Sequence, residues 1–187
     1  MGFPNSDNHL MKERDIAGAL RRAEAVLRRR PRTGLHEDAP ATACWEGGTR
    51  VISHHANGAA IPTDIAIELG GSGDQVSPGW LFRAGLAACA ATCIALGAAA
   101  DGVELQRLEI VASSRSDTRG LLGMLDADGK PVPAGSRDLQ LRVRIAARQV
   151  GEQRLRALVD AGIRCSPVYA ALQLAVPLAV HIDVEAT

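Results

Sequence analysis

The chain has 187 residues, of which 47% are hydrophobic and only 3% aromatic. Lys and Arg together number 21, as do Asp and Glu, so the formal net charge is zero. This balance favours neither nucleic acid nor an anionic membrane as a partner, and so few aromatic residues offer no stacking platform for single-stranded nucleic acid. The length predicts one ordinary domain plus an extension.

Neither a secretory signal nor a membrane span is expected. The amino-terminal residues lack the basic and apolar regions of a signal peptide. The longest uncharged apolar run, residues 84–100, is shorter than the roughly 18 residues that a span needs and is better explained as a core helix. Four cysteines in a chain of this length, with no secretory signal expected, indicate reduced thiols rather than a disulfide scaffold. We therefore expect a soluble, cytoplasmic protein.

Residues 1–40 are expected to form an amino-terminal extension that carries a basic helix. Apolar residues recur at helical spacing between residues 15 and 30, and Pro31 ends the pattern. Arginines lie off that apolar face at positions 21, 22, 28, 29 and 30. Because acidic residues balance them in the whole chain, we interpret this face as solvated rather than as a binding patch.

Residues 41–187 are expected to form the folded domain. Strands are predicted by alternation or by turn signals at 43–54 (a hairpin with a Gly-Gly turn), 63–69, 103–115, 139–145 and 178–184. Helices are predicted at 78–100, which is almost wholly apolar, at 151–162, and from residue 166 onward. A Gly- and Pro-rich connection occupies residues 120–136.

This order of elements predicts an α+β fold in which antiparallel sheet wraps around the apolar helix. A helix that is apolar on nearly all sides must be buried on nearly all sides. One sheet face covers only one side of such a helix. We therefore expect a second copy of the chain to cover the other side, which predicts a homodimer.

Two cysteines on the apolar helix are the first candidates for chemistry. Cys89 and Cys93 are four residues apart, so they share one helix face with Cβ atoms about 5–6 Å apart. A relaxed disulfide needs roughly 3.5–4.5 Å, so the pair is not expected to bridge while the helix stays regular. The ordinary role of such a cysteine is that of a small core residue. Cys44, beside Trp45 at a strand start, is expected to be packed in this way.

A reactive Cys89 needs a cation from another segment. It lies about 16 Å along the helix axis from Pro78, where the helix dipole has faded, and burial alone raises the pKa of a thiol. We assign the role to Arg50, in the predicted hairpin. Arg83 is a poor candidate because it lies on a different face of the helix.

Three other patterns are not expected to carry chemistry. The segment 70–73 (GGSG) lacks the third glycine of G-x-G-x-x-G, since Val76 stands there, and we interpret it as a flexible loop. His54 and His55 lack zinc-ligand partners, because the chain has no C-x-x-C. No G-x-S-x-G elbow or Ser/His/Asp order points to a hydrolase. We therefore expect no metal and no cofactor.

Four segments of the chain resemble the OsmC/Ohr superfamily. They are residues 68–73 (ELGGSG), 77–89 (SPGWLFRAGLAAC), 117–123 (DTRGLLG) and 166–172 (SPVYAAL). The second, in which a proline opens the helix that carries the cysteine, is the most specific. The order of elements fits throughout residues 42–186 and leaves the amino-terminal extension uncovered.

The resemblance implies an intertwined homodimer with two sites at its interface. It also implies thiol-dependent reduction of organic hydroperoxides or hydrogen peroxide. Cys89 matches the peroxidatic position, whose thiolate attacks the O–O bond and becomes a sulfenic acid. A second cysteine, here expected to be Cys165, then forms a disulfide with it, and an external dithiol reduces the pair.

Two departures from the family pattern bear on function. In the peroxide-reducing members an acidic residue near the start of the helix pairs with the activating arginine, but Gly79 and Trp80 stand in its place here. An ungapped alignment at Pro167 puts Ser166 at the resolving position, one residue after Cys165.

Two functions therefore stay open. The first is a peroxide reductase that uses Cys89, with Cys165 as resolving cysteine and Arg50 as activating cation; Cys93 is an alternative disulfide partner if the helix distorts. The second is an OsmC-like dimer without peroxidase activity that binds a small apolar ligand at its interface, with structural thiols.

Overall fold

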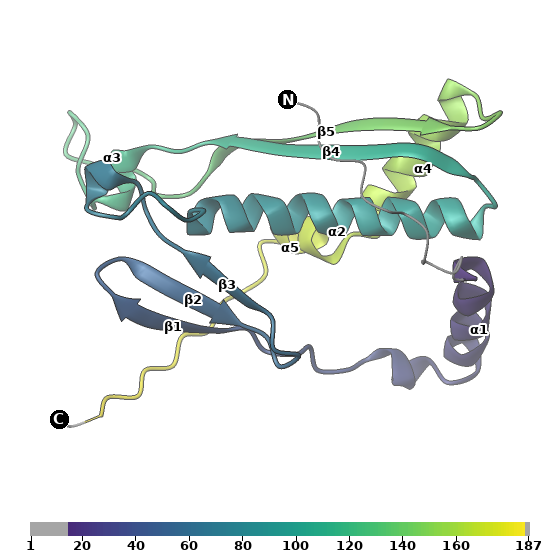
Figure 1. Cartoon of the computed structure of the whole chain (residues 1–187), viewed down its shortest axis with the longest axis horizontal. Coiled ribbons are helices and arrows are strands. Elements are labelled where there is room, and N and C mark those ends of the chain that lie inside the picture. Colours follow the sequence, from purple (N-terminus) through teal and green to yellow (C-terminus); the bar gives the residue numbers. More distant parts are fainter. Residues whose placement is uncertain (1–14, 186–187) are drawn as a thin grey trace.

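The computed structural model describes residues 15–185 and shows an α+β protein with antiparallel sheets, as predicted. Two sheets lie on opposite sides of one long helix, α2 (Pro78–Ala100) (Figure 1). A three-stranded sheet precedes α2 in the chain and a two-stranded sheet follows it.

The amino-terminal extension forms the predicted helix, α1 (Ile16–Arg29), followed by a short 3-10 helix, η1 (Pro31–Gly34). Asp15 caps α1 by accepting a hydrogen bond from the N–H of Gly18 at 2.6 Å. The helix lies beside the carboxyl-terminal end of α2 (Figure 1). The rest of the predicted extension, residues 1–14, lies outside the described residues.

The three-stranded sheet is built from consecutive antiparallel strands. They are β1 (Thr42–Gly47), β2 (Arg50–His54) and β3 (Ala60–Thr63), in the order β1-β2-β3. Gly47 and Gly48 have positive φ angles of 113° and 56°, which suit glycine in the tight turn between β1 and β2. The predicted hairpin is confirmed.

The predicted strand at residues 63–69 is wrong beyond its first residue. β3 ends at Thr63, and a 3-10 helix, η2 (Ile67–Leu69), follows. The N–H groups of Leu69 and Gly70 donate to carbonyls three residues back instead of to a neighbouring strand. The apolar alternation therefore does not mark a buried face, and Ile67 is exposed.

Helix α2 has the predicted bounds. The Ser77 hydroxyl caps it by accepting from the N–H of Trp80 at 3.2 Å, and Pro78 occupies its first position. Four of its residues are buried, each at most 2% exposed, and they form one stripe at a spacing of four: Leu86, Ala90, Ile94 and Ala98.

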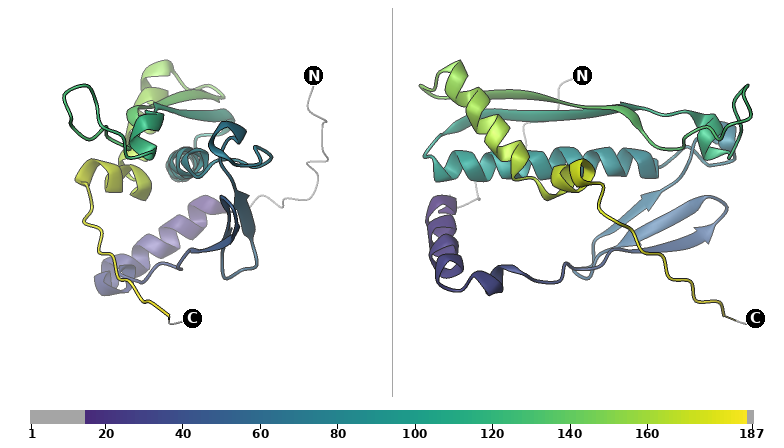
Figure 2. Two further views of the ribbon diagram at one scale, coloured as in Figure 1. Left: turned by 90° about the vertical axis from the view of Figure 1, so that its left-hand side faces the viewer. Right: turned by 180° about the vertical axis from the view of Figure 1, so that it is seen from behind.

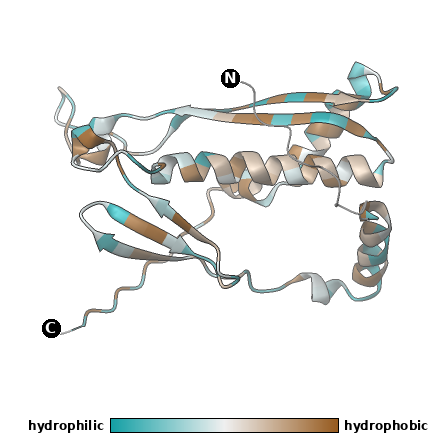
Figure 3. Ribbon diagram, viewed as in Figure 1, coloured by the Kyte–Doolittle hydropathy of each residue, from teal (hydrophilic) through white to brown (hydrophobic). Residues whose placement is uncertain are grey.

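The prediction that α2 is buried on nearly all sides is wrong for the single chain. Figure 3 shows white to pale brown residues along most of α2, including faces that lie away from the two-stranded sheet. One chain fully buries only the stripe of four residues and leaves the rest of α2 half-buried or exposed.

A long antiparallel hairpin covers one side of α2. Its strands are β4 (Leu105–Arg115) and β5 (Arg137–Ala147), and the connection contains a short helix, α3 (Thr118–Leu121). The right view of Figure 2 shows the hairpin running along α2. The strands predicted at 103–115 and 139–145 are confirmed.

Helices α4 (Glu152–Arg164) and α5 (Pro167–Leu174) confirm the two helices predicted after the hairpin. The carboxyl-terminal end of α4 approaches the middle of α2 closely. A Cβ atom added to Gly162 would lie 2.6 Å from Cγ1 of Ile94. Glycine is therefore needed at this crossing, and it brings residues 165 and 166 against α2.

The predicted final strand at 178–184 does not form in the single chain. Its alternating apolar residues are each at least 73% exposed: Leu178, Val180, Ile182 and Val184. Beyond Val176 the segment makes no backbone hydrogen bond with another described residue. A strand needs a neighbouring strand, and this segment runs away from the body of the chain (Figure 2).

Candidate functional site

The beginning of α5 lies against Cys89 in the middle of α2. The Ser166 hydroxyl donates a hydrogen bond to Cys89, with Oγ and Sγ 3.2 Å apart. Ser166 is fully buried, and its Oγ also accepts from the N–H of Tyr169 as the cap of α5. Because these two bonds fix the hydroxyl, a donor is held ready for negative charge on the Cys89 sulfur.

Cys165, one residue before Ser166, lies beside Cys93. It ends α4 and is exposed, and its carbonyl oxygen accepts a hydrogen bond from the Cys93 thiol at 3.5 Å. Burial raises the pKa of the Cys93 thiol, and the neighbouring sulfurs of Cys89 and Cys165 raise it further. The structure thus brings the three thiols together with Ser166, and we call these four residues the sulfur cluster.

Arg50, the predicted activating residue, lies in a separate group of polar side chains. Its guanidinium donates to the Asp64 carboxylate at 3.1 and 3.3 Å, to the Ser72 hydroxyl at 2.7 Å and to the Asp74 carboxylate. Asp64 is only 4% exposed and also accepts from the Thr49 hydroxyl at 2.5 Å. We call these five residues the Arg50 cluster.

The charges of the Arg50 cluster are satisfied within it. Hydrogen bonds from Ser72 and Thr49 hold the pKa of Asp64 well below its usual range, and a bond from Ser72 is the main cause of the lowered pKa of Asp74. The hydrogen bond to Asp64 is the main cause of the raised pKa of Arg50. Two ionised carboxylates therefore face one guanidinium. Across residues 15–185, no hydrogen bond or ion pair joins Arg50 to Cys89.

A groove of about 440 Å³ opens beside Cys93 and Cys165, between α1, α2 and α4. Most of its lining is apolar, and Leu20 of the amino-terminal extension contributes to it. Where α2 ends and α4 begins, Arg154 pairs with Asp101 at 3.1 Å. Neither Cys89 nor Ser166 lines this groove, so the sulfur cluster has one end at the groove, Cys93 and Cys165, and one end away from it.

Sequence reasoning missed the partners of Arg50 and the contact made by Ser166. Asp64 falls in a segment that was predicted as strand, and nothing in its pattern marks a buried carboxylate. Asp74 directly follows the glycine-rich segment, and a Ser-Gly-Asp turn is the one signal that could have pointed to it. The signal for the contact of Ser166 with Cys89 was the alignment at Pro167, which puts Ser166 at the resolving position, whereas the hydrogen bond itself depends on the α2–α4 crossing.

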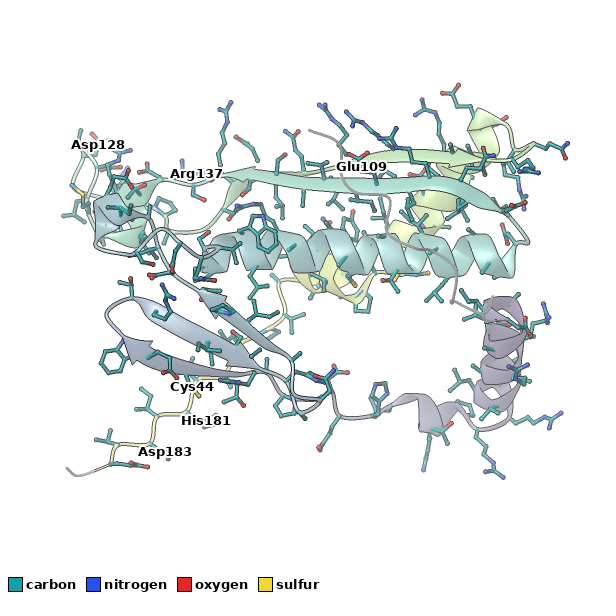
Figure 4. The ribbon with its side chains drawn as sticks, in the orientation of Figure 1. Cys44, Glu109, Asp128, Arg137, His181 and Asp183 are labelled. Carbon is teal, nitrogen blue, oxygen red and sulfur yellow. The ribbon has the colours of Figure 1, made fainter. Side chains whose placement is uncertain are left out.

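Other candidate positions lie as follows. No carboxylate opens α2, where Gly79 and the exposed Trp80 stand. Cys44 is exposed on β1, in the three-stranded sheet (Figure 4), and not packed as predicted. Among the residues that the structure describes, no three His, Cys, Asp or Glu side chains are grouped so as to hold a metal ion.

The sequence model of the OsmC-like protein family matches residues 71–181, which is more than half of the chain. The chain belongs to the OsmC-like family. No curated protein matches it. The amino-terminal extension lies outside the matched residues, as does the three-stranded sheet that carries Arg50.

Solved structures of OsmC-like proteins share the fold. An OsmC-like protein from Mycoplasma pneumoniae is 18% identical, with a TM-score of 0.61, and the match covers 74% of this chain and 89% of that one. An organic hydroperoxide resistance protein from Legionella pneumophila is 20% identical, with a TM-score of 0.54 and coverage of 74% and 91%. An OsmC-like protein of unknown function from Vibrio cholerae is 12% identical, with a TM-score of 0.58 and coverage of 73% and 94%.

Helix α2 is long and apolar enough to cross a membrane by length and composition alone. The sequence expectation differs because it counted only the uncharged run after Arg83. In this OsmC-like fold α2 is the helix between the two sheets, and no membrane protein is indicated.

Proposed function

We propose that this OsmC-like protein is a thiol peroxidase that reduces organic hydroperoxides or hydrogen peroxide at Cys89. The observation that carries the proposal is the hydrogen bond from the buried Ser166 hydroxyl to Cys89 Sγ. A half-buried sulfur with a fixed donor beside it is suited to act as a thiolate nucleophile. The name of the Legionella pneumophila neighbour, an organic hydroperoxide resistance protein, supports the substrate class.

The proposed reaction uses two cysteines and one peroxide. The Cys89 thiolate attacks one oxygen of the peroxide, the O–O bond breaks, and an alcohol or water leaves after taking up a proton. Cys89 is then a sulfenic acid. The Cys165 thiolate attacks Cys89 Sγ, a disulfide forms, and the hydroxyl leaves as water. An external dithiol reduces the disulfide, so the electrons balance among thiols and peroxide, and the proposal needs no cofactor.

Cys165 has the freedom that a resolving cysteine needs. It ends α4, is exposed, and directly precedes Ser166, whose side chain already touches Cys89. At rest Cys165 contacts Cys93 through its carbonyl oxygen, so we expect resolution to require its side chain to swing toward Cys89. A residue at a helix end allows such a change more readily than one inside a helix.

The role of Arg50 as activating cation stays a prediction. Its test is the pH dependence of Cys89 alkylation in Arg50→Gln, with Arg83→Gln as the matched control. If Arg50 activates Cys89, the midpoint of that profile rises only in Arg50→Gln. An unchanged midpoint would leave Arg50 as a structural residue of its own cluster.

We further propose that two copies form a homodimer. Large apolar side chains of α2 that one chain leaves exposed support this: Trp80, Phe82 and Leu96. The segment 178–184 has strand alternation but no partner strand, and a sheet edge of a second copy would supply one.

Lysine substitutions in that segment test the dimer. Replacing both Val180 and Ile182 by Lys should give monomers in light scattering after size exclusion, because both side chains lie on the apolar face of the alternation. His181→Lys, on the opposite face, should leave the mass unchanged. A mass that is the same for both variants, or a monomeric wild type, would contradict the proposal.

The decisive test of the peroxidase is Cys89→Ser. Peroxide consumption driven by an external dithiol should fall roughly a thousandfold or more, because the attacking sulfur is gone. Cys44→Ser removes a thiol from the three-stranded sheet and should leave consumption unchanged. Full activity in Cys89→Ser would overturn the proposal.

The second candidate, a dimer that binds a small apolar ligand, is favoured by one observation. No carboxylate opens α2, and its first turns instead expose Trp80 and Phe82. For this function, apolar aromatic ligands should raise the melting temperature of wild type and of Cys89→Ser alike, and neither should consume peroxide.

The cytoplasmic location expected from the sequence stays a prediction.

A further inference from the structure

We propose that Cys93 displaces Cys89 from its disulfide with Cys165, so that the oxidised protein rests as a Cys93–Cys165 disulfide with Cys89 returned to the thiol. This inference rests on the proposed peroxidase function and adds a second redox-active pair to it. It also assigns the groove between α1, α2 and α4 as the place where an external dithiol meets the oxidised protein.

The resting contacts of Cys165 favour Cys93 over Cys89. The carbonyl oxygen of Cys165 accepts from the Cys93 thiol at 3.5 Å. The contact with Cys89 is made by the next residue, Ser166, at 3.2 Å. Cys165 and Cys93 line the same groove, and Cys89 is absent from it. After oxidation, relaxation of Cys165 to its resting place therefore returns it to the groove that Cys93 also lines.

Only Cys165 can carry the disulfide between the two helix positions. Cys89 and Cys93 are one helical turn apart on α2, and their Cβ atoms, about 5–6 Å apart, are too distant for a relaxed disulfide. Cys165 lies on a different element, at the end of α4, and can bridge to either. The exchange then needs no distortion of α2.

The exchange is an ordinary thiol–disulfide reaction. The Cys93 thiolate attacks Sγ of Cys165, a new S–S bond forms, and the bond between Cys165 and Cys89 breaks. Cys89 leaves as a thiolate, and the proton given up by Cys93 balances the one that Cys89 takes up. One disulfide replaces another, so no oxidant or reductant is consumed.

The surroundings of the sulfurs favour this direction. Burial and the neighbouring sulfurs raise the pKa of the Cys93 thiol, which makes its thiolate a strong nucleophile and a poor leaving group. The leaving sulfur of Cys89 meets the Ser166 hydroxyl, a donor that is already in place. The disulfide is therefore expected to move to the end of the sulfur cluster at the groove.

The exchange predicts how many equivalents of peroxide each chain takes up without reductant. If the disulfide stayed on Cys89, one equivalent of peroxide would exhaust the reactive thiol. If the disulfide moves to Cys93, Cys89 is free to react again, and each chain takes up two equivalents. The expected difference in peroxide uptake without reductant is therefore twofold.

The experiment adds one and then two equivalents of cumene hydroperoxide to the reduced full-length chain without dithiol. Samples are quenched with an alkylating agent, and the disulfides are mapped by peptide mass spectrometry with fragmentation, since no Lys or Arg separates Cys89 from Cys93. Wild type should accumulate the Cys93–Cys165 disulfide and then show dimedone-reactive Cys89 with the second equivalent. Cys93→Ser should stop at the Cys89–Cys165 disulfide after one equivalent.

Controls make the outcomes distinct. Cys44→Ser should behave as wild type, and Cys93→Ala should repeat Cys93→Ser; unchanged thermal unfolding shows that each variant is folded. A wild type that keeps the Cys89–Cys165 disulfide and consumes one equivalent overturns the exchange but leaves the peroxidase standing. Unchanged thiols in wild type overturn the peroxidase, and the exchange with it.

Discussion

The sulfur cluster and the Arg50 cluster hold reactive groups in different ways. Within residues 15–185 no charged side chain bonds to the sulfur cluster, whose hydrogen bonds run from Ser166 to Cys89 and from Cys93 to the Cys165 carbonyl. The Arg50 cluster holds one guanidinium between two carboxylates at contact distances. Within one chain, the cation expected to activate Cys89 is therefore committed to carboxylates, and the donor that does touch the sulfur is a neutral hydroxyl.

This difference separates stability from reactivity. The Arg50 cluster joins β2 to the segments before α2, so damage there should lower stability. The sulfur cluster lies where α5 begins, so damage there should lower reactivity first.

The largest expected effect on stability comes from Asp64→Asn. Its carboxylate is almost fully buried and accepts from Thr49, Arg50 and Ser72. Removing its charge leaves the guanidinium without its main partner, so we expect the melting temperature to fall by roughly 5 °C or more. The rate of Cys89 alkylation per folded molecule should stay unchanged.

Asp74→Asn is the matched control, since Asp74 bonds the same guanidinium but is 55% exposed on its side chain. It should shift the melting temperature far less, because exposed pairs contribute little. Equal shifts for the two variants would show that burial of Asp64 does not set its importance.

The next effect in size is expected from Gly162→Ala at the α2–α4 crossing. The added Cβ would lie 2.6 Å from Ile94 Cγ1, so the helices must separate, at a cost of about 1–3 kcal/mol. Separation moves Cys165 and Ser166 away from α2, and peroxide reactivity should fall together with stability in chemical denaturation.

Gly97→Ala is the matched control, because it makes the same substitution on α2, the other helix of the crossing. Its Cβ would meet Leu158 Cδ1 at 3.4 Å, an ordinary contact, so stability should hold or rise with the better helix propensity of Ala. If Gly162→Ala were as stable as Gly97→Ala, the crossing would not be close-packed as described.

Ser166→Ala is expected to lower both the reactivity of Cys89 and, more modestly, stability. Loss of a hydrogen bond to a charged sulfur should slow the reaction of Cys89 with peroxide by roughly tenfold. Loss of the α5 cap should cost about 1 kcal/mol of stability. Ser114→Ala, which removes a hydroxyl bonded to Arg83 at 3.4 Å, should leave the rate unchanged. An unchanged rate in Ser166→Ala would mean that the hydroxyl only caps the helix.

Much of the fold could be predicted from the sequence, because its elements have local causes. Pro78 after a capping serine fixed the start of α2, and alternation over 139–145 located β5. The segment 63–69 failed because alternation alone does not supply a partner strand. The segment 178–184 failed for the same reason, since no strand of the described chain lies beside it.

The site was harder to predict from the sequence, because it depends on contacts between distant segments. The resemblance implied a disulfide between Cys89 and Cys165, whereas in the resting chain Cys89 contacts the Ser166 hydroxyl and Cys93 contacts the Cys165 carbonyl. A one-residue offset decides between these arrangements, and only the α2–α4 crossing fixes it.

The smallest expected effects are on the pH dependence of stability, where the two clusters should limit stability at opposite ends. The pKa of Asp64 is lowered in the folded chain, so its contribution is present above the unfolded value of about 3.9 and is lost as pH falls through the folded value. The pKa of Cys93 is raised, so its contribution is present below the unfolded value of about 8.5 and is lost as pH rises through the folded value.

Chemical denaturation between pH 3 and pH 10 separates the two limbs. Asp64→Asn should flatten the acid limb below about pH 4 and leave the alkaline limb intact. Cys93→Ser should flatten the alkaline limb above about pH 8.5 and leave the acid limb intact. If either substitution altered both limbs, the clusters would be electrostatically coupled, and Arg50 would then act on the cysteines despite its carboxylate partners.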